Sequence, residues 1–362
     1  MNIIITLTMA LFITMTSAYA DMHMYIQQPS QEKSLNDDNL HIYFCGTGDP
    51  EIAMQNIRKP SCLAVMGDNE FFVIDTGEGA SQNLGALGLP LEKLKHIFVT
   101  HWHSDHMSGI GYLNNGSWLA GRPSPLILHG PYGIETITSA LNKLYSLDTL
   151  FRGINRQGLL DVNNSVIHSQ LIKVPNTGAG NPVLKTHNIT LSPFMVNHNP
   201  VYPALGYVIQ YKTCKIVISG DTKIDSNLED VSKNADLLIN EAFSNHLGQV
   251  IQKNIETQPN SKIMIEYYKQ TKQYHSDTLE LAKMAQASSV KNLIITHLVP
   301  AIPTTQSAKD DFIKGMNKIY SGPIKVADDR DEVVINVLDG KCTINYNPAQ
   351  QPNINIIQKI KS

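Results

Sequence analysis

Short apolar runs, each six to eight residues long, alternate with turn residues over most of the chain. Runs of this length that are bounded by Gly, Asn, Asp or Pro are typical of β-strands. The tetrapeptide Gly-Asp-Asn-Glu at 67–70 predicts a hairpin turn between two of the runs. The predicted strands cover residues 41–48, 62–67, 71–77, 95–100, 125–130, 189–196, 204–211, 214–220, 235–240, 292–297, 332–337 and 342–347.

Helices are predicted between these strands, and the two halves of the chain follow a similar plan. Residues 152–190 are rich in Gly, Asn and Pro and have no firm period, so we expect an insertion or lid there. Strands mixed with helices, without a linker between the halves, predict one layered α/β domain. The predicted helices cover residues 80–89, 133–151, 246–272, 278–289 and 306–320.

The N-terminus has the pattern of an export signal. Residues 3–13 are mostly apolar but too few for a bilayer span, which needs about 20. The sequence Ala-Tyr-Ala at 18–20 is typical of a cleavage site, so Asp21 is the predicted first residue of an exported, periplasmic or secreted protein. A buried N-terminal helix is the alternative. The predicted divisions are a signal peptide at 1–20, a polar lead-in at 21–39, the domain at 40–347 and a polar tail at 348–362.

Composition narrows the class of partner. The chain has 29 Lys and Arg against 32 Asp and Glu, a net charge of −3. This balance predicts no strong nucleic-acid-binding patch. No membrane anchor is expected after signal cleavage, and a homo-oligomer is left open.

Four cysteines are present, Cys45, Cys62, Cys214 and Cys342. None has the spacing of a cysteine metal cluster, and an exported protein could pair them in three ways. A core of this size does not need disulfides, and Cys45 could pack as a small hydrophobe.

One polar stretch stands out, the sequence THWHSDHMSG at 100–109. Residues two apart on an extended chain point to the same side, so His101 and His103 can face one point. Asp105 and His106 follow where the chain turns before Gly109. Imidazole and carboxylate ligands together suit zinc, iron or manganese. A solvated polar loop is the alternative interpretation.

Three further polar residues each follow an apolar strand. They are His198, Asp221 and His297. Strand tips are where sites in α/β proteins are usually built. With HxHxDH at 101–106, this order resembles the signature of the metallo-β-lactamase superfamily, over about residues 41–338. The resemblance implies an α/β fold, a four-layer αβ/βα sandwich.

The resemblance also implies two divalent metal ions, with zinc favoured over manganese or iron. It assigns His101, His103 and His198 to one ion. It assigns Asp105, His106 and His297 to the other, with Asp221 bridging both. Two such ions can share a water and lower its pKa to about 7, which makes hydroxide available at neutral pH.

Flanking residues resemble one branch of the superfamily, the tRNase Z-like hydrolases. CGTGDP at 45–50 and DTGEG at 75–79 are similar to segments of that branch, in which the residue matching Asp75 supports the metal histidines. Glu241 and His275 match a glutamate and a histidine that stabilise and protonate a phosphate. Asn240 departs from the pattern, which has histidine there.

The sequence YHSDTLE at 274–280 places His275 just before a helix. Asp277 is expected to cap that helix, with Glu280 completing a capping box, although the branch often has Thr at Asp277. The aromatic residues of 264–270 are interpreted as core or helix face rather than as a binding platform.

These observations predict an exported dinuclear hydrolase that cleaves phosphodiester bonds with a metal-bound hydroxide. Asp105 would orient the nucleophile, and His275, held by Glu241, would assist the leaving group. A metallo-β-lactamase or an arylsulfatase-like ester hydrolase is the rival enzyme. A metal-binding protein that retains the fold is the non-enzyme alternative.

Overall fold

A computed structural model describes residues 31–255 and 261–349. The predicted signal peptide, the start of the lead-in and almost all of the tail lie outside these residues. None of the helices in the described part of the chain has both the length and the apolar character needed to cross a bilayer.

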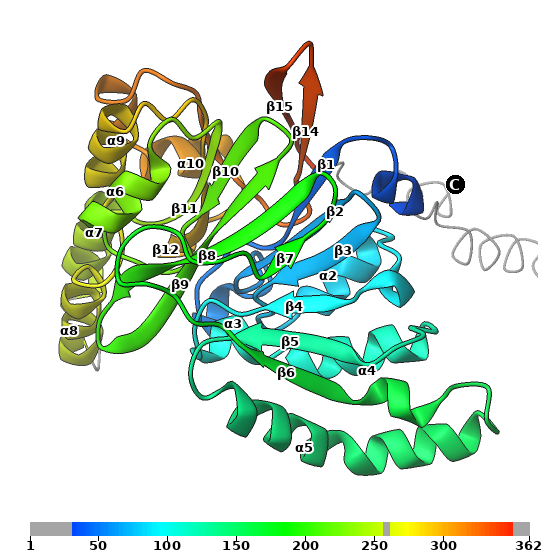
Figure 1. The fold of residues 1–362 in the computed structure, drawn as a ribbon. Coiled ribbons are helices and arrows are strands. Elements are labelled where there is room, and N and C mark those ends of the chain that lie inside the picture. Colours follow the sequence, from blue (N-terminus) through cyan, green and yellow to red (C-terminus); the bar gives the residue numbers. More distant parts are fainter. Residues whose placement is uncertain (1–30, 256–260, 350–362) are drawn as a thin grey trace, which may run out of the picture.

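Two mixed sheets face each other (Figure 1). The first has eight strands in the order β15-β14-β1-β2-β3-β4-β5-β6, antiparallel from β15 to β3 and parallel from β3 to β6. Its strands are β1 (Leu40–Gly46), β2 (Cys62–Gly67), β3 (Glu70–Ile74), β4 (His96–Phe98), β5 (Leu126–Gly130), β6 (Ile167–Leu171), β14 (Glu332–Leu338) and β15 (Lys341–Asn347).

The second sheet has seven strands in the order β13-β12-β11-β10-β9-β8-β7. It repeats the plan of the first, because β7 to β10 are antiparallel and β10 to β13 are parallel. Its strands are β7 (Leu184–Lys185), β8 (Ile189–His198), β9 (Val201–Tyr211), β10 (Cys214–Ile218), β11 (Leu237–Phe243), β12 (Leu293–Val299) and β13 (Ile324–Val326).

Helices cover the outer face of each sheet (Figure 1). Leu84, Leu113 and Ile134 pack three helices against the first sheet, and Leu228, Leu281 and Phe312 pack three others against the second. The helices are α2 (Ala80–Ala86), α3 (Ser104–Met107), α4 (Ile110–Leu119), α5 (Ile134–Asn155), α6 (Ser226–Ser232), α7 (Asn245–Ile255), α8 (Ser261–Thr271), α9 (Thr278–Ala287) and α10 (Gln306–Phe312). The predicted four-layer sandwich is confirmed.

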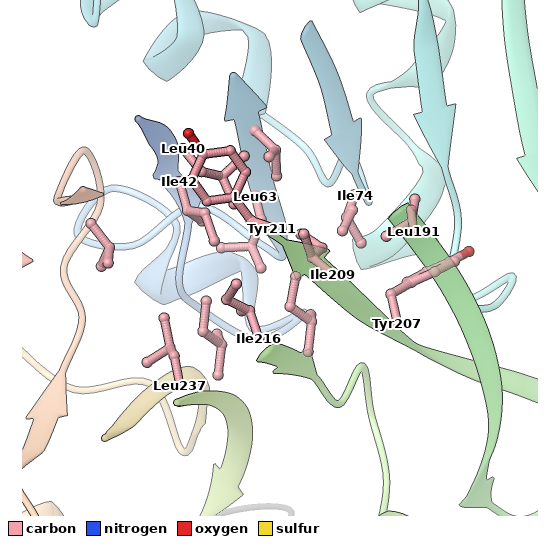
Figure 2. Close-up of a cluster of buried hydrophobic side chains, with 14 of the residues drawn as sticks. Leu40, Ile42, Leu63, Ile74, Leu191, Tyr207, Ile209, Tyr211, Ile216 and Leu237 are labelled. Atoms are coloured by element: carbon pink, nitrogen blue, oxygen red, sulfur yellow. The ribbon is translucent and has the colours of Figure 1, made fainter. Parts of the chain in front are cut away.

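The main core lies between the sheets. Figure 2 shows Leu40, Ile42 and Leu63 of the first sheet close to Ile209 and Ile216 of the second. Every residue of β1 is buried, because its alternate side chains enter the central core and the helix-covered outer core. Two buried faces explain why the central strands are continuous apolar runs in the sequence.

Residues 152–190 differ from the predicted insertion or lid. Helix α5 continues to Asn155, and β6 pairs in parallel with β5 as an edge strand of the first sheet. Its sequence, IHSQL, buries only Ile167 well, so a strand period was hard to recognise. The predicted helix at 246–272 is two helices, α7 and α8.

All four cysteines form disulfides, Cys45–Cys62 and Cys214–Cys342. The first joins neighbouring strands β1 and β2. The second joins β10 of one sheet to β15 of the other. Cys45 is therefore half of a disulfide and not only a packed hydrophobe.

Candidate metal centre

The seven predicted ligands come together at one end of the sandwich, where strands from both sheets end. β4 leads into His101 and His103, and the short helix α3 carries Asp105 and His106. β8 ends at His198, Asp221 follows the end of β10, and His297 lies in the last part of β12.

Local irregularities turn two of these ligands toward the centre. On β12, Thr296 pairs with Glu241 and Leu298 with Ala242, so His297 is an extra residue in a β-bulge. Its φ is 42°, in the left-handed region. A bulge bends the strand and redirects the side chain. Gly220 (φ 61°) precedes Asp221, and a Cβ there would lie 2.5 Å from the carbonyl oxygen of Leu205. Only glycine allows this approach.

The ligands form two groups of four that share Asp221. Within each group, one nitrogen or carboxylate oxygen per residue lies within 4.8 Å of all the others. The groups are His101, His103, His198 and Asp221, and Asp105, His106, Asp221 and His297.

Contacts within the first group are short. His101 Nε2 lies 2.9 Å from His103 Nδ1, which lies 3.3 Å from His198 Nε2. Asp221 Oδ2 lies 3.9 Å from His101 Nε2 and 3.8 Å from His198 Nε2. Three imidazole nitrogens that face one point cannot satisfy each other as donors and acceptors, whereas a shared cation accepts all their lone pairs.

The second group has the same character. His297 Nε2 lies 3.1 Å from Asp105 Oδ2 and 3.4 Å from Asp221 Oδ2. His106 Nε2 lies 3.3 Å from Asp221 Oδ2. His106 Nε2 and Asp221 Oδ1 are buried without a hydrogen-bond partner among the described residues. Buried polar atoms without partners are costly, so a cation between them fits the donor set.

Other residues hold the imidazoles in the tautomer that a metal needs. Asp75 Oδ2 accepts a hydrogen bond from His106 Nδ1 at 2.8 Å, and Asp75 is itself fixed by the amide and hydroxyl of Thr100, both at 2.8 Å. His198 Nδ1 donates to the carbonyl oxygen of Tyr274 at 3.0 Å. A proton on Nδ1 leaves the Nε2 lone pair free for coordination.

Burial and mutual charge shift the pKa values of the ligands. Burial lowers the pKa of His101 and lowers that of His198 to about 4, which keeps both neutral. Burial would raise the pKa of Asp105, but His106 and His297 outweigh it and hold that pKa well below its usual range. Burial would lower the pKa of His106 and of His297, but Asp221 and Asp105 outweigh it and raise both, that of His297 to about 9. Metal binds neutral imidazoles and ionised carboxylates, so metal binding at the second group would release these protons.

Glu241 and His275 lie beside the second group. Glu241 Oε1 is 3.1 Å from His275 Nδ1 and accepts from the backbone amides of Thr222 (3.1 Å) and Ser276 (2.9 Å). Burial raises the pKa of Glu241, and His275 opposes that shift. The His275 ring stacks near that of His297, with centroids 5.6 Å apart. The two residues are thus brought together within reach of the ligands.

The departures from the tRNase Z pattern have structural roles here. Asn240 Nδ2 donates to the Glu241 carbonyl (2.7 Å) and to Ser276 Oγ (3.2 Å). Asp277 Oδ1 accepts from the amides of Leu279 (2.9 Å) and Glu280 (3.2 Å), so the predicted helix cap is confirmed. Both therefore support the segment that carries His275.

A cavity of about 240 Å³ opens beside the ligands. Tyr267 and Tyr274 line it, and no sequence pattern indicated either residue. Tyr268 is buried and Tyr267 lies half-exposed on the face of α8, as the interpretation of 264–270 expects, and that face borders the cavity. Tyr274 precedes His275 in the chain, which could have indicated it, but no pattern distinguishes Tyr267 from Tyr268.

Comparison with known proteins agrees with this geometry. Residues 58–257 match the Metallo-beta-lactamase superfamily. The chain belongs to that superfamily and is a metal-dependent hydrolase. Divalent metal binding follows from the fold and from the clusters described above.

The chain is also similar to proteins named Ribonuclease Z. The one from Mycobacterium bovis (strain BCG / Pasteur 1173P2) is 29% identical over 301 residues, which are 82% of this chain and 99% of the relative. The one from Mycobacterium tuberculosis (strain ATCC 25618 / H37Rv) is 28% identical over 298 residues, 82% and 98% of the two chains.

Solved structures share the fold at lower identity. Human tRNase Z, short form, aligns with a TM-score of 0.54 at 19% identity, covering 81% of this chain and 98% of that one. A metallo-beta-lactamase fold protein from Bacillus subtilis aligns with a TM-score of 0.56 at 18% identity, covering 82% and 100%.

Proposed function

We propose that this protein is an exported, dinuclear metal-dependent phosphodiesterase. The observation that carries the proposal is the pair His275 and Glu241, 3.1 Å apart and next to His297. An imidazole beside a buried carboxylate can carry the positive charge and the proton that a phosphate oxygen requires. The similarity to proteins named Ribonuclease Z supports the same substrate class.

Two divalent ions, zinc by preference, would be held by the two ligand groups, with Asp221 common to both. When bound, such ions supply Lewis-acid stabilisation and a nucleophile at neutral pH. Imidazole-rich coordination suits zinc, and manganese or iron is the alternative.

The chain's own residues position and protonate the substrate. Asp105, whose Oδ2 lies 3.1 Å from His297 Nε2, would present a carboxylate that orients the attacking water. His275 lines the cavity and would donate to a nonbridging oxygen or to the leaving group. Glu241 would hold the imidazole in place, because its Oε1 is anchored by two backbone amides.

Export is supported by the cysteines. All four are disulfide-bonded, and such bonds persist in oxidising compartments and are rare in the cytosol. Recovery of the protein from the periplasm or medium with Asp21 at its N-terminus would agree with export. An intact Met1 on abundant cytoplasmic protein would reject it.

The test of the activity uses metal-loaded mature protein with bis-p-nitrophenyl phosphate, nitrocefin and p-nitrophenyl sulfate. Hydrolysis of the diester is expected to dominate. His275→Ala should lower diester turnover by about 10²–10⁴-fold with metal content unchanged. Glu241→Gln should cause a smaller loss, and replacement of the partly exposed His246 by Ala is the matched control.

The ratio of diester to β-lactam turnover is the deciding number. It should fall in His275→Ala, because the oxyanion of a β-lactam would depend mainly on metal. An unchanged ratio, or turnover of nitrocefin alone, would refute the phosphodiesterase proposal in favour of β-lactam hydrolysis. Turnover of the sulfate alone would refute it in favour of an arylsulfatase-like activity.

A further inference from the structure

The residues that line the cavity beside the ligands are of two chemical kinds. Some are polar or ionisable, among them His103, Asp105 and His275. Others are apolar or aromatic, namely Pro50, Val299, Tyr267 and Tyr274. Among the described residues, no Lys or Arg lines the cavity. The cavity can thus take one anionic centre at the ligands and a flat apolar group beside it.

Tyr267 presents its ring from helix α8. Its neighbour Tyr268 anchors the helix, because it is 4% exposed and packs with Phe243 and Val299. The two tyrosine rings meet edge to face, with centroids 5.6 Å apart. Tyr267 itself is 43% exposed, although it lines the cavity. The Tyr267 ring is therefore supported by the ring of Tyr268 and is accessible from the cavity.

Tyr274 is fixed to the ligands themselves. Its carbonyl oxygen accepts from His198 Nδ1 at 3.0 Å. Its ring centroid lies 5.3 Å from that of His198 and 5.0 Å from that of His275. These contacts fix the position of the Tyr274 ring relative to the point where a phosphate would be attacked.

We infer that Tyr267 and Tyr274 bind a planar aromatic group, of the nucleobase type, carried by a small phosphodiester. The inference rests on the proposed phosphodiesterase function. Bases stack readily on aromatic side chains. A long polynucleotide needs a track of Lys and Arg along its phosphates, whereas the described residues that line the cavity include neither and the chain carries a net charge of −3. The substrate class is therefore a diester with one ring beside its phosphate.

The experiment measures the contribution of the ring to binding separately from that of the phosphate. Hydrolysis of bis-p-nitrophenyl phosphate is inhibited with thymidine 5′-monophosphate or with 2-deoxyribose 5-phosphate, which lacks the base. Wild type should bind the nucleotide at least about 10-fold more tightly, as stacking of one base allows. Tyr267→Leu should lower the affinity for the nucleotide by about 10-fold and change the affinity for the sugar phosphate by less than about twofold.

Tyr267→Phe should behave as wild type, because it keeps the ring. Tyr112→Leu replaces a tyrosine that is 59% exposed on α4 and should change neither inhibitor. Equal affinity of wild type for the two inhibitors, or an equal effect of Tyr267→Leu on both, would overturn the inference. Failure of wild type to cleave any diester would instead overturn the proposed function.

Discussion

Asp75 and His106 are 31 residues apart in the chain and 2.8 Å apart in the fold. Asp75 directly follows β3 and is in the left-handed region, with φ 59°. Thr100, on the neighbouring chain segment, donates hydrogen bonds to both of its carboxylate oxygens. A strained backbone of this kind costs about 1–3 kcal/mol and is usually found at functional sites. The geometry orients His106 toward the other ligands of the second group.

Asp75→Asn tests this orientation. Asn tolerates the left-handed backbone as well as Asp does, so the fold should be kept while the charge is lost. We expect metal affinity of the second group to fall by about 10–100-fold, as for other carboxylates that support metal-bound histidines. Competition with a chromophoric chelator measures it. The control variant Asp148→Asn should keep the metal affinity of wild type. Unchanged metal affinity in Asp75→Asn would show that the contact between Asp75 and His106 has no role in metal binding.

Asp221 should matter more for metal content than any histidine, because it belongs to both ligand groups. His198→Ala removes one ligand of the first group only and should leave about one equivalent of metal. Asp221→Ala should leave less than that. Elemental analysis after gel filtration compares the variants. Equal metal content in the two would argue against the shared position of Asp221.

The two disulfides should differ in their contribution to stability. Cys45–Cys62 closes a separation of 17 residues and Cys214–Cys342 one of 128, between the two sheets. A disulfide lowers the entropy of the unfolded chain, and more so when it closes a longer loop. The first should therefore contribute about 3 kcal/mol and the second about 5 kcal/mol to the free energy of unfolding. Urea unfolding of Cys45→Ala/Cys62→Ala and Cys214→Ala/Cys342→Ala should show the larger loss in the second. The reverse order would refute the argument.

His41 should make stability depend on pH. Burial would lower its pKa, but Glu332 at 2.8 Å and Asp37 at 2.9 Å outweigh burial and raise the pKa above 6.5. The folded state therefore binds this proton more tightly than the unfolded chain does. The stabilisation is complete below pH 6.5 and is lost as pH rises through the folded pKa.

The unfolding free energy of wild type and His41→Gln should thus differ most below pH 6.5 and converge as the pH rises through the folded pKa of His41. Urea unfolding at several pH values measures the difference, and subtraction of the variant removes the titration of other histidines. A difference that is constant, or that grows with pH, would contradict the assignment.

The sequence indicated the ligands and the supporting Asp75 and Glu241, but not the backbone geometry that orients them. His198, Asp221 and His297 each come at or after an apolar run that forms a strand, which is a strong pattern. The bulge that turns His297 and the left-handed φ of Asp75 depend on pairing between distant strands, so no local pattern encodes them.

Weakly patterned elements were missed for a similar reason. Helix α4, with the sequence IGYLNNGSWL, contains two Gly and two Asn, residues of low helix propensity, and no helix was predicted there. It forms because tertiary burial overrides propensity, as the fully buried Trp118 shows. Tyr267 was not predicted to line the cavity, because only the packing of α8 decides which of two adjacent tyrosines faces it.

The central claim is that two metal ions, held by groups that share Asp221, enable phosphodiester cleavage. The most direct test titrates zinc into metal-free mature protein while the hydrolysis of bis-p-nitrophenyl phosphate is followed. We predict that activity is absent without metal and reaches its plateau at about two equivalents per chain. Full activity in the metal-free protein, or a plateau at one equivalent, would contradict it.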